Sequence, residues 1–405
     1  MDNRVDPRAL QEALATIYDK DRLSLADEQK AYRAGLVKKW AWYMGETVLG
    51  KSVQPIEPRL WEMMAVLFEN QLQANRPPQS IYEATTLTTV PIPTTWALPI
   101  IRDLFPSLIM NKICSVQPMP AQSAGSMRVY WWRAYREDNS PEDRVTVPDS
   151  DYTPRDENAV PKRLRYKLTN TTVEATKDIL NATWSSEAEE DVAGGLGLNL
   201  EQELLTVMTE EILRELEQRV LTAILVGATA GNVNWAWTPT AAYTSAQEYY
   251  QTLFHAFIDA ENYVAAAMYR NCDYIIAGSR VLGYLKKAST WEMAPRSLDP
   301  AGPVASGVQL SGRVGMWDVY STPYINQDRA IISYYPKGML HGGYIFAPYI
   351  PLMPMPKVYA EMQPYDDATL PGAYVNTDKW NRNVRTRNAV YFCEPQMFAT
   401  ISISA

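Results

Sequence analysis

Histidine and cysteine are scarce in this chain of 405 residues, which contains two of the former and three of the latter. The cysteines, Cys114, Cys272 and Cys393, are far apart and odd in number, which argues against a disulfide scaffold and suits a reducing compartment. We expect them to be small buried apolar residues. Because His255 and His341 have no set of further ligands near them in the sequence, we predict no metal site.

Long hydrophobic runs are missing too, since no stretch reaches 18 uninterrupted apolar residues. The charged start of the chain lacks the apolar core of a signal peptide. We therefore expect a protein that is soluble and intracellular where it is made, with no membrane partner. Neither sign of charge dominates: 38 basic and 46 acidic residues give a net charge of -8, so no basic patch predicts a dedicated nucleic-acid reader.

The sequence contains none of the motifs G-x-x-x-x-G-K-[ST], G-x-G-x-x-G, G-x-S-x-G or H-E-x-x-H. Adjacent carboxylates such as Asp366 and Asp367 do not converge as catalytic partners must. We predict no catalytic residue, no cofactor and no enzymatic activity. Aromatic residues are plentiful, with 12 Trp and 25 Tyr, and such side chains are favoured at protein interfaces.

Residues 1–76 have the pattern of helices without a strand between them. Pro7 can start one helix, Ser24 with Asp27 can cap a second, and Pro58 can open a third. Two interpretations stay open: an arm that packs on other subunits or on the rest of the chain, and a small helical domain. Prolines that follow indicate an extended boundary segment: Pro77, Pro78, Pro91, Pro93 and Pro99.

A long hairpin is predicted from two segments rich in strand-forming residues, 127–135 and 160–173. Its charge is unevenly divided. The stem carries basic residues, whereas the tip, 137–157, is acidic. Because an isolated two-stranded ribbon is marginally stable in water, a ribbon of this length should lie on another surface, with a solvated hairpin as the alternative.

One long helix is predicted from Leu198 to Gly227, with Asn199 as its cap and acidic residues in its first half. Its apolar residues recur every four positions, a row that drifts slowly around a helix of 3.6 residues per turn. Beyond it, helical patterns at 247–269 and from Ser279 alternate with strand patterns at 273–277, 314–321, 330–335, 344–347 and 390–403. The fold class predicted is α+β.

This order resembles the major capsid proteins of tailed double-stranded DNA phages, which share the Hong Kong 97-type fold, and most closely their T-even-type myophage branch. Three stretches carry the likeness: Leu98–Pro106 with Val116–Met119, Ala347–Leu352, and Gly312–Pro323. The resemblance implies an extended hairpin loop that lies over a neighbouring subunit, a peripheral domain built on a long spine helix, and an axial domain at the centre of each ring.

The resemblance implies the following division of the chain: N-terminal arm 1–76, peripheral domain 77–126, hairpin loop 127–182, peripheral domain with spine helix 183–228, axial domain 229–356, and returning peripheral strands 357–405. It implies self-assembly into hexamers and pentamers of an icosahedral virion capsid, built in the host cytoplasm around DNA without sequence-specific binding. Portal protein, scaffold, maturation protease and decoration proteins are the implied partners.

The charge division suggests inter-subunit contacts between the acidic hairpin tip and a basic surface of a neighbour. The candidate residues are Glu137, Asp138, Glu142, Asp143, Asp149 and Asp151 on the tip, and Lys379, Arg382, Arg385 and Arg387 on the receiving surface. Two other functions stay open. One is the shell of a cellular encapsulating nanocompartment with the same fold, and the other is an enzyme of unknown type.

Overall fold

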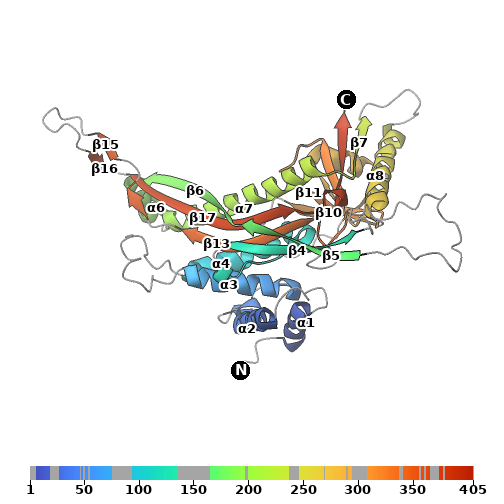
Figure 1. Ribbon diagram of the computed structural model, residues 1–405. Coiled ribbons are helices and arrows are strands. Elements are labelled where there is room, and N and C mark those ends of the chain that lie inside the picture. Colours follow the sequence, from blue (N-terminus) through green and yellow to red (C-terminus); the bar gives the residue numbers. More distant parts are fainter. Residues whose placement is uncertain are drawn as a thin grey trace.

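The computed structural model describes most of the chain in separate ranges. These are residues 6–18, 27–45, 47–48, 51–52, 55–74, 94–123, 125–135, 165–196, 199–236, 246–268, 270–288, 291–293, 308–336, 341–354, 357–359, 362–364, 374–376 and 379–404. Within them, two sheets, a long helix and a projecting hairpin lie above a layer of N-terminal helices (Figure 1).

The N-terminal helices form at the predicted places and pack on the rest of the chain. They are α1 (Pro7–Tyr18), α2 (Asp27–Met44) and α3 (Trp61–Ala74), the last opened by a 3-10 turn at Pro58–Leu60. A two-residue strand pair that we did not predict, β1 (Thr47–Val48) with β2 (Lys51–Ser52), lies between α2 and α3. So short a pair has too few residues to give an alternating pattern in the sequence.

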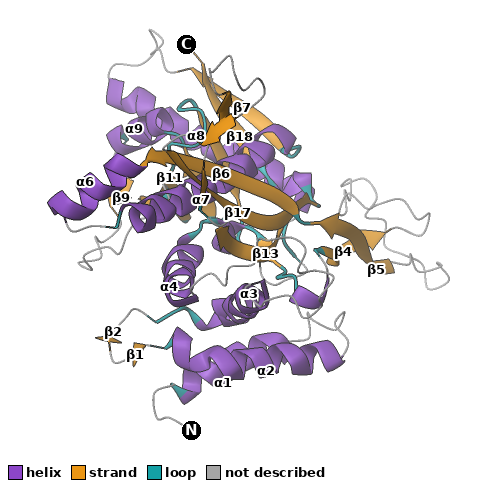
Figure 2. Cartoon of the chain, turned by 90° about the vertical axis from the view of Figure 1, so that its left-hand side faces the viewer, coloured by secondary structure: helices purple, strands orange, loops and turns teal. Residues whose placement is uncertain are grey.

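Helix α3 is buried on all sides along Trp61–Gln71, because it lies between α2 and the sheet strand β13 (Tyr344–Pro354) (Figure 2). Polar anchors fix it there. Arg33 of α2 pairs with Glu62 at 2.6 Å, with both side chains under 5% exposed. Asn70 donates to the backbone oxygens of Met119 and Tyr349. The N-terminal helices are therefore part of the core of the same chain.

The next segment is helical and leads into strand β3 (Ser115–Val116). It consists of helix α4 (Thr94–Leu104), a 3-10 turn (Phe105–Ser107) and helix α5 (Met110–Ile113). Pro99, which we expected to keep the chain extended, lies inside α4. A proline inside a helix removes one backbone hydrogen bond and crowds the preceding turn, so this short helix depends on its packing in the core, where Ile101 and Leu104 are buried. The other prolines of the predicted boundary segment lie outside the described residues.

A five-stranded sheet and one long helix form the central plate of the molecule. The strand order is β14-β17-β13-β3, with β6 also paired to β17. The strands not yet introduced are β6 (Thr176–Ser185), β14 (Val358–Tyr359) and β17 (Lys379–Phe392). Helix α7 (Leu200–Gly227) packs along β6 and β17 (Figure 1). Asn199 accepts from Gln202 N at 3.2 Å, which confirms the predicted cap.

Even-numbered residues of β6 and β17 face α7, because side chains alternate along a strand. Asp178 of β6 binds Arg219 of α7 at 2.7 Å, and Val384 of β17 is fully buried. The buried carboxylate of Glu217, on α7, accepts from Ile109 N at 2.8 Å and so ties α7 to the start of α5. The plate and its helix are thus one packed unit.

A seven-stranded mixed sheet forms at the other end of α7, in the order β7-β18-β12-β8-β11-β10-β9. Its strands are β7 (Gly231–Ala236), β8 (Tyr274–Ala277), β9 (Trp291–Met293), β10 (Gln309–Val314), β11 (Trp317–Ser321), β12 (Arg329–Ser333) and β18 (Ala399–Ser404). Helices α8 (Ala246–Met268) and α9 (Ser279–Lys287) pack with it. The last strand lies between β7 and β12, so the chain end contributes to this sheet and not to the plate.

The predicted hairpin is present as a sheet of its own, β4 (Ser126–Tyr135) paired with β5 (Arg165–Glu174) over ten residue pairs. It projects from the plate (Figures 1 and 2). After Ala175 the chain turns into β6 of the plate, a strand that we did not predict. Helix α6 (Ser186–Leu196) was also not predicted, because its two glycines, Gly194 and Gly195, indicate a joint. A small hairpin, β15 (Met362–Pro364) with β16 (Tyr374–Asn376), extends at the opposite end.

The described residues confirm the α+β fold class and the burial of the three cysteines. No helix in this part of the chain is long and apolar enough to cross a membrane. The described residues also hold no cluster of three or more His, Cys, Asp or Glu side chains that could bind a metal ion.

Candidate assembly surfaces

The root of the hairpin, where β4 leaves the plate and β5 returns, is held by a compact set of contacts. Apolar side chains of the stem, among them Val129 and Trp131, pack on Ala389 and Tyr391 of the plate. The backbone N of Ala175 donates to Gly125 O at 2.7 Å and joins the two ends of the ribbon. The stem therefore covers part of the sheet face that lies opposite α7.

Gly125 lies immediately before β4 and allows the backbone to turn sharply into that strand. Its φ of 81° lies in the left-handed region that disfavours other residues, and a Cβ there would stand 2.7 Å from Arg387 Nη2. Arg387 reaches this point from β17, donates to Ala175 O at 3.4 Å and lies over the ring of Tyr349. One arginine thus contacts both ends of the hairpin and the plate.

Three of the four basic residues predicted from the sequence lie on the sheet face opposite α7. Lys379, Arg385 and Arg387 are odd-numbered residues of β17, and Lys177 of β6 pairs in register with Arg387. We call these four the basic sheet face. Lys177 and Lys379 are exposed, and Arg385 and Arg387 are partly exposed. The odd-numbered residues of β6 and β17 include no acidic side chain.

Arg385 and Arg387 are two residues apart on one face, and their like charges repel. Burial, and then the charge of Arg387, lower the pKa of Arg385, although a guanidinium stays protonated in proteins. Arg385 also donates from Nε to Met353 Sδ at 2.8 Å, a weak acceptor. An approaching carboxylate would relieve this repulsion and supply a stronger acceptor.

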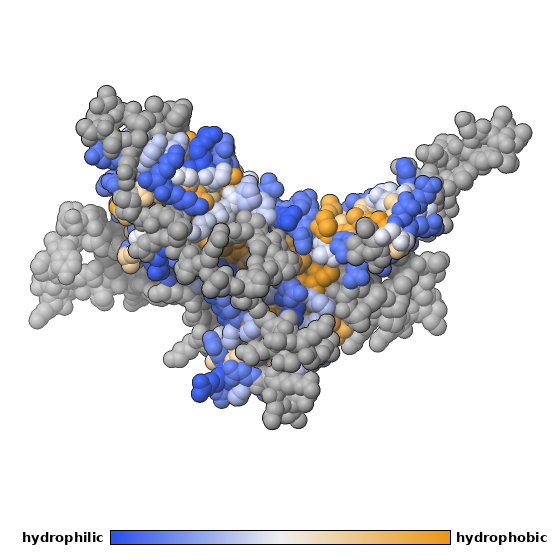
Figure 3. Space-filling view, turned by 180° about the vertical axis from the view of Figure 1, so that it is seen from behind, coloured by the Kyte–Doolittle hydropathy of each residue, from blue (hydrophilic) through white to orange (hydrophobic). Residues whose placement is uncertain are grey.

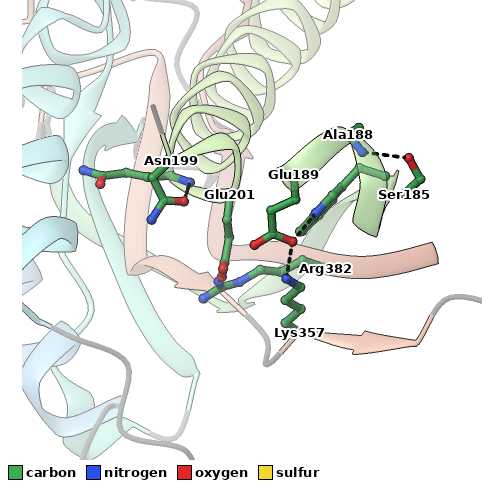
Figure 4. Close-up of polar contacts among 9 residues, drawn as sticks. Ser185, Ala188, Glu189, Asn199, Glu201, Lys357 and Arg382 are labelled. Atoms are coloured by element: carbon green, nitrogen blue, oxygen red, sulfur yellow. Dashed lines mark hydrogen bonds and ion pairs between the residues drawn. The ribbon is translucent and has the colours of Figure 1, made fainter. Parts of the chain in front are cut away.

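Arg382 lies on the other face of β17, toward α7. Its guanidinium pairs with Glu201 at the start of α7, and its side chain is 12% exposed (Figure 4). It therefore does not share a surface with the other three basic candidates. Lys177 takes the place of Arg382 on that surface. The sequence could have indicated this, because the apolar residues of β6 alternate, at Leu180, Ala182 and Trp184, so that odd-numbered residues such as Lys177 face the other way.

The six acidic candidates of the hairpin tip lie outside the described residues. They are Glu137, Asp138, Glu142, Asp143, Asp149 and Asp151.

The surface of α6 and α7 is acidic as well. Its exposed carboxylates are Glu187, Glu190, Asp191, Glu203, Glu211 and Glu215. Val207, an apolar side chain that is 60% exposed, lies between Glu203 and Glu211 along α7. Figure 3 shows the molecule from behind, with hydrophilic and hydrophobic patches next to each other. The two faces of the plate thus differ in charge.

A second cluster of polar and aromatic side chains stabilises the end of the plate at which α6 begins (Figure 4). Lys357 donates to Glu189 at 2.5 Å and lies over the rings of Trp184 and Trp380. The indole of Trp184 donates to the same carboxylate at 3.1 Å. A cation between aromatic faces and a carboxylate is a stabilising arrangement. It joins β6, α6 and β17 to the residue that precedes β14.

The hydrogen bond from Lys357 lowers the pKa of Glu189, and burial opposes part of that shift. A lowered carboxyl pKa stabilises the fold above the unfolded pKa of about 4.3, and this contribution is lost as the pH falls through the lower folded pKa. We expect Glu189→Gln to lower the unfolding free energy at pH 7 and to lower it by less near pH 3. Denaturant unfolding at both pH values would measure this. Glu187→Gln, exposed on the same helix, should leave stability unchanged at both.

Comparisons with known proteins found remote structural likenesses and one family match. Three solved structures with similar chains come from Mycobacterium phage Adephagia, from the capsid of the cyanophage P-SCSP1u and from the capsid of the Myoviridae phage XM1. The first is 12% identical, with a TM-score of 0.43, over 74% of this chain and 90% of that one. The second is 11% identical, with a TM-score of 0.41, over 73% and 88%. The third is 11% identical, with a TM-score of 0.39, over 69% and 86%. These are remote likenesses.

Residues 134–365, more than half of the chain, match the family described as Major capsid protein Gp23. The chain belongs to this family of phage major capsid proteins. The resemblance to tailed-phage capsid proteins is thereby confirmed. A search among proteins with curated descriptions found no match.

Proposed function

We propose that this protein is the non-enzymatic subunit of an icosahedral shell, in which it forms hexamers and pentamers around double-stranded DNA. The seven-stranded sheet with α8 and α9 is the axial domain at the ring centres. The plate with α7 is the peripheral domain. Family membership supports the capsid role, and the observation that carries the mode of assembly is the hairpin. Its ten residue pairs form a sheet separate from the plate. The root of this ribbon packs on the plate of its own chain, and the part that projects beyond the root needs a further surface to lie on.

The surface that suits the hairpin tip is the basic sheet face of a neighbouring subunit. The tip, 137–157, holds eight acidic residues against two arginines. The α6–α7 surface would repel it, whereas the basic sheet face carries four cations and no carboxylate of its own strands. Complementary charge selects the partner surface and fixes the register of docking more than it adds affinity.

The remaining partners follow from the capsid role. The portal protein occupies one vertex, and scaffold, maturation protease or decoration proteins act on the shell during or after assembly in the host cytoplasm. DNA is enclosed without sequence-specific contacts, which agrees with a net charge of -8 and with basic residues spread along the chain.

Size-exclusion chromatography followed by negative-stain electron microscopy of the expressed full-length chain tests the proposal. We expect closed particles or ring-shaped capsomers with subunit interfaces of obligate size, above about 2,000 Å². A large particle filled with DNA would indicate a virion, because a capsid encloses the phage genome. A small empty particle would indicate a nanocompartment. A stable monomer that turns over a substrate would refute the shell.

Charge reversal tests the docking surface. We expect Lys177→Glu combined with Lys379→Glu to reduce particle yield in low salt, because both lysines are exposed and an acidic tip would be repelled. The difference from the unsubstituted chain should shrink as salt screens the charges. Light scattering at about 20 mM and 500 mM salt would measure it, since the Debye length falls severalfold between these concentrations.

The matched control changes the same amount of charge elsewhere, with Lys38→Glu and Lys286→Glu. Reversal at Arg385 and Arg387 should strengthen the effect. Arg382→Glu should act differently, by destabilising the fold, because it places a second carboxylate beside Glu201. If shells of the lysine variants form normally in low salt, the tip does not dock here.

A further inference from the structure

Gln117 lies between the plate and the hairpin and contacts the backbone of both. It is fully buried. Its backbone N donates to Phe346 O of β13 at 2.8 Å, which fixes it to the plate. Its side-chain amide faces the outer edge of β4. There Nε2 donates to Tyr130 O at 2.9 Å, and Oε1 accepts from Tyr130 N at 3.2 Å.

The amide of Gln117 therefore pairs with one residue of β4 as a neighbouring strand would. A primary amide carries a donor and an acceptor side by side, which matches a backbone N–H and C=O on a strand edge. Glutamate lacks the donor and methionine lacks both groups, although each has a similar length. Among residues of this shape, only glutamine can make both bonds.

The other contacts of the hairpin root differ in kind. The stem packs on the plate through apolar side chains such as Val129 and Trp131, and apolar contact is not directional. The bond between Ala175 and Gly125 joins the two ends of the ribbon to each other. Arg387 of β17 donates at 3.4 Å to the backbone O of Ala175, a residue that lies between β5 and β6 and not on β4. A pair of hydrogen bonds to one residue of β4 adds what these contacts lack, a fixed position and angle of the strand relative to β13.

We infer that Gln117 is a positioning residue that sets the direction in which the hairpin leaves the plate, and so where its tip meets a neighbouring subunit. The second half of this inference rests on the proposed docking of the hairpin. The first half concerns the single chain and can be tested without assembly.

Hydrogen exchange of the unassembled full-length chain, measured by mass spectrometry, is the test. In Gln117→Met, we expect peptides from 126–135 and 165–174 to exchange about tenfold faster, whereas peptides from α7 and from the seven-stranded sheet keep their rates. Gln117→Glu should act in the same direction. The control is Ser333→Ala, which removes, on strand β12 of the seven-stranded sheet, a fully buried donor to Met397 O and should leave hairpin exchange unchanged.

If hydrogen exchange accelerates equally over the whole chain, Gln117 has a merely structural role and the inference is overturned. Unchanged exchange in the hairpin of a folded Gln117→Met variant would overturn it as well. If that variant does not fold, the unsubstituted chain decides. Its Tyr130 amide should exchange about tenfold more slowly than the Arg128 amide, which lies two residues away on the same strand edge. Equal rates would overturn the inference.

A particle-formation assay on Gln117→Met distinguishes a failure of this inference from a failure of the proposed docking on which it rests. If hairpin exchange accelerates in Gln117→Met and shells fail to close, both stand. If exchange accelerates and shells form normally, Gln117 positions the hairpin, but docking of the hairpin is not what assembly requires.

Discussion

Replacement of Glu211 by proline is expected to lower the unfolding free energy by about 3 kcal/mol or more and to abolish particle formation. Glu211 lies in the middle of α7, a helix of 28 residues that spans about 42 Å. A proline there removes a backbone hydrogen bond and forces its ring against the preceding turn. Helix α7 packs on β6 and β17, contacts β12 and β13, and leads directly into β7, so a kink would misalign the plate and the seven-stranded sheet.

Denaturant unfolding and electron microscopy would measure the two effects. Glu211→Ala is the control, because the side chain is exposed and its ion pair with Arg214 at 3.2 Å is a surface pair. We expect it to change stability by less than about 0.5 kcal/mol. Normal shells from the proline variant would mean that α7 is not the rigid backbone of the subunit.

Removal of Arg33 is expected to destabilise the whole chain, and not only its N-terminal helices. Arg33→Ala removes the cation from a buried ion pair and leaves the charge of the Glu62 carboxylate in the core, which costs about 3–5 kcal/mol when both groups are buried as they are here. Because α3 lies between α2 and β13, the loss should appear as a lower midpoint of a single unfolding transition.

Two further variants give the comparison. Arg59→Ala removes an arginine from an exposed pair with Glu57, 55% and 57% exposed, and should change stability by less than about 1 kcal/mol. Arg33→Met with Glu62→Leu should recover much of the loss, since a buried pair can be replaced by apolar residues of similar volume. A separate early transition in Arg33→Ala would show that the N-terminal helices fold independently of the plate.

The long helix was predictable because its determinants are local. Asn199 caps it, no proline interrupts it, and its apolar row continues from Leu205 to Ile224. The paired strands of the hairpin were predictable for a similar reason, since both segments are rich in strand formers. Strand β6 and helix α6 were missed because their signals are weak: β6 buries only Trp184 fully, and α6 contains Gly194 and Gly195.

The receiving surface shows what local patterns leave open. A cluster of four cations near the chain end indicated one basic patch, but strand alternation sends Arg382 toward Glu201 and leaves Lys379, Arg385 and Arg387 on the opposite face. Lys177, more than two hundred residues earlier in the sequence, joins them only because β6 pairs with β17.

The sequence by itself determined the N-terminal helices, the long helix, the hairpin strands, the α+β class and the absence of recognisable catalytic motifs, because caps, prolines and apolar periodicity act over a few residues. It also determined the acidic tip, which is a matter of composition. Only the tertiary structure decided which residues share a face, where the chain end pairs, and that Gln117 joins the hairpin to the plate. These features depend on contacts between segments that are far apart in the chain. The register of strand pairing fixes such contacts, and it is set when the sheets form.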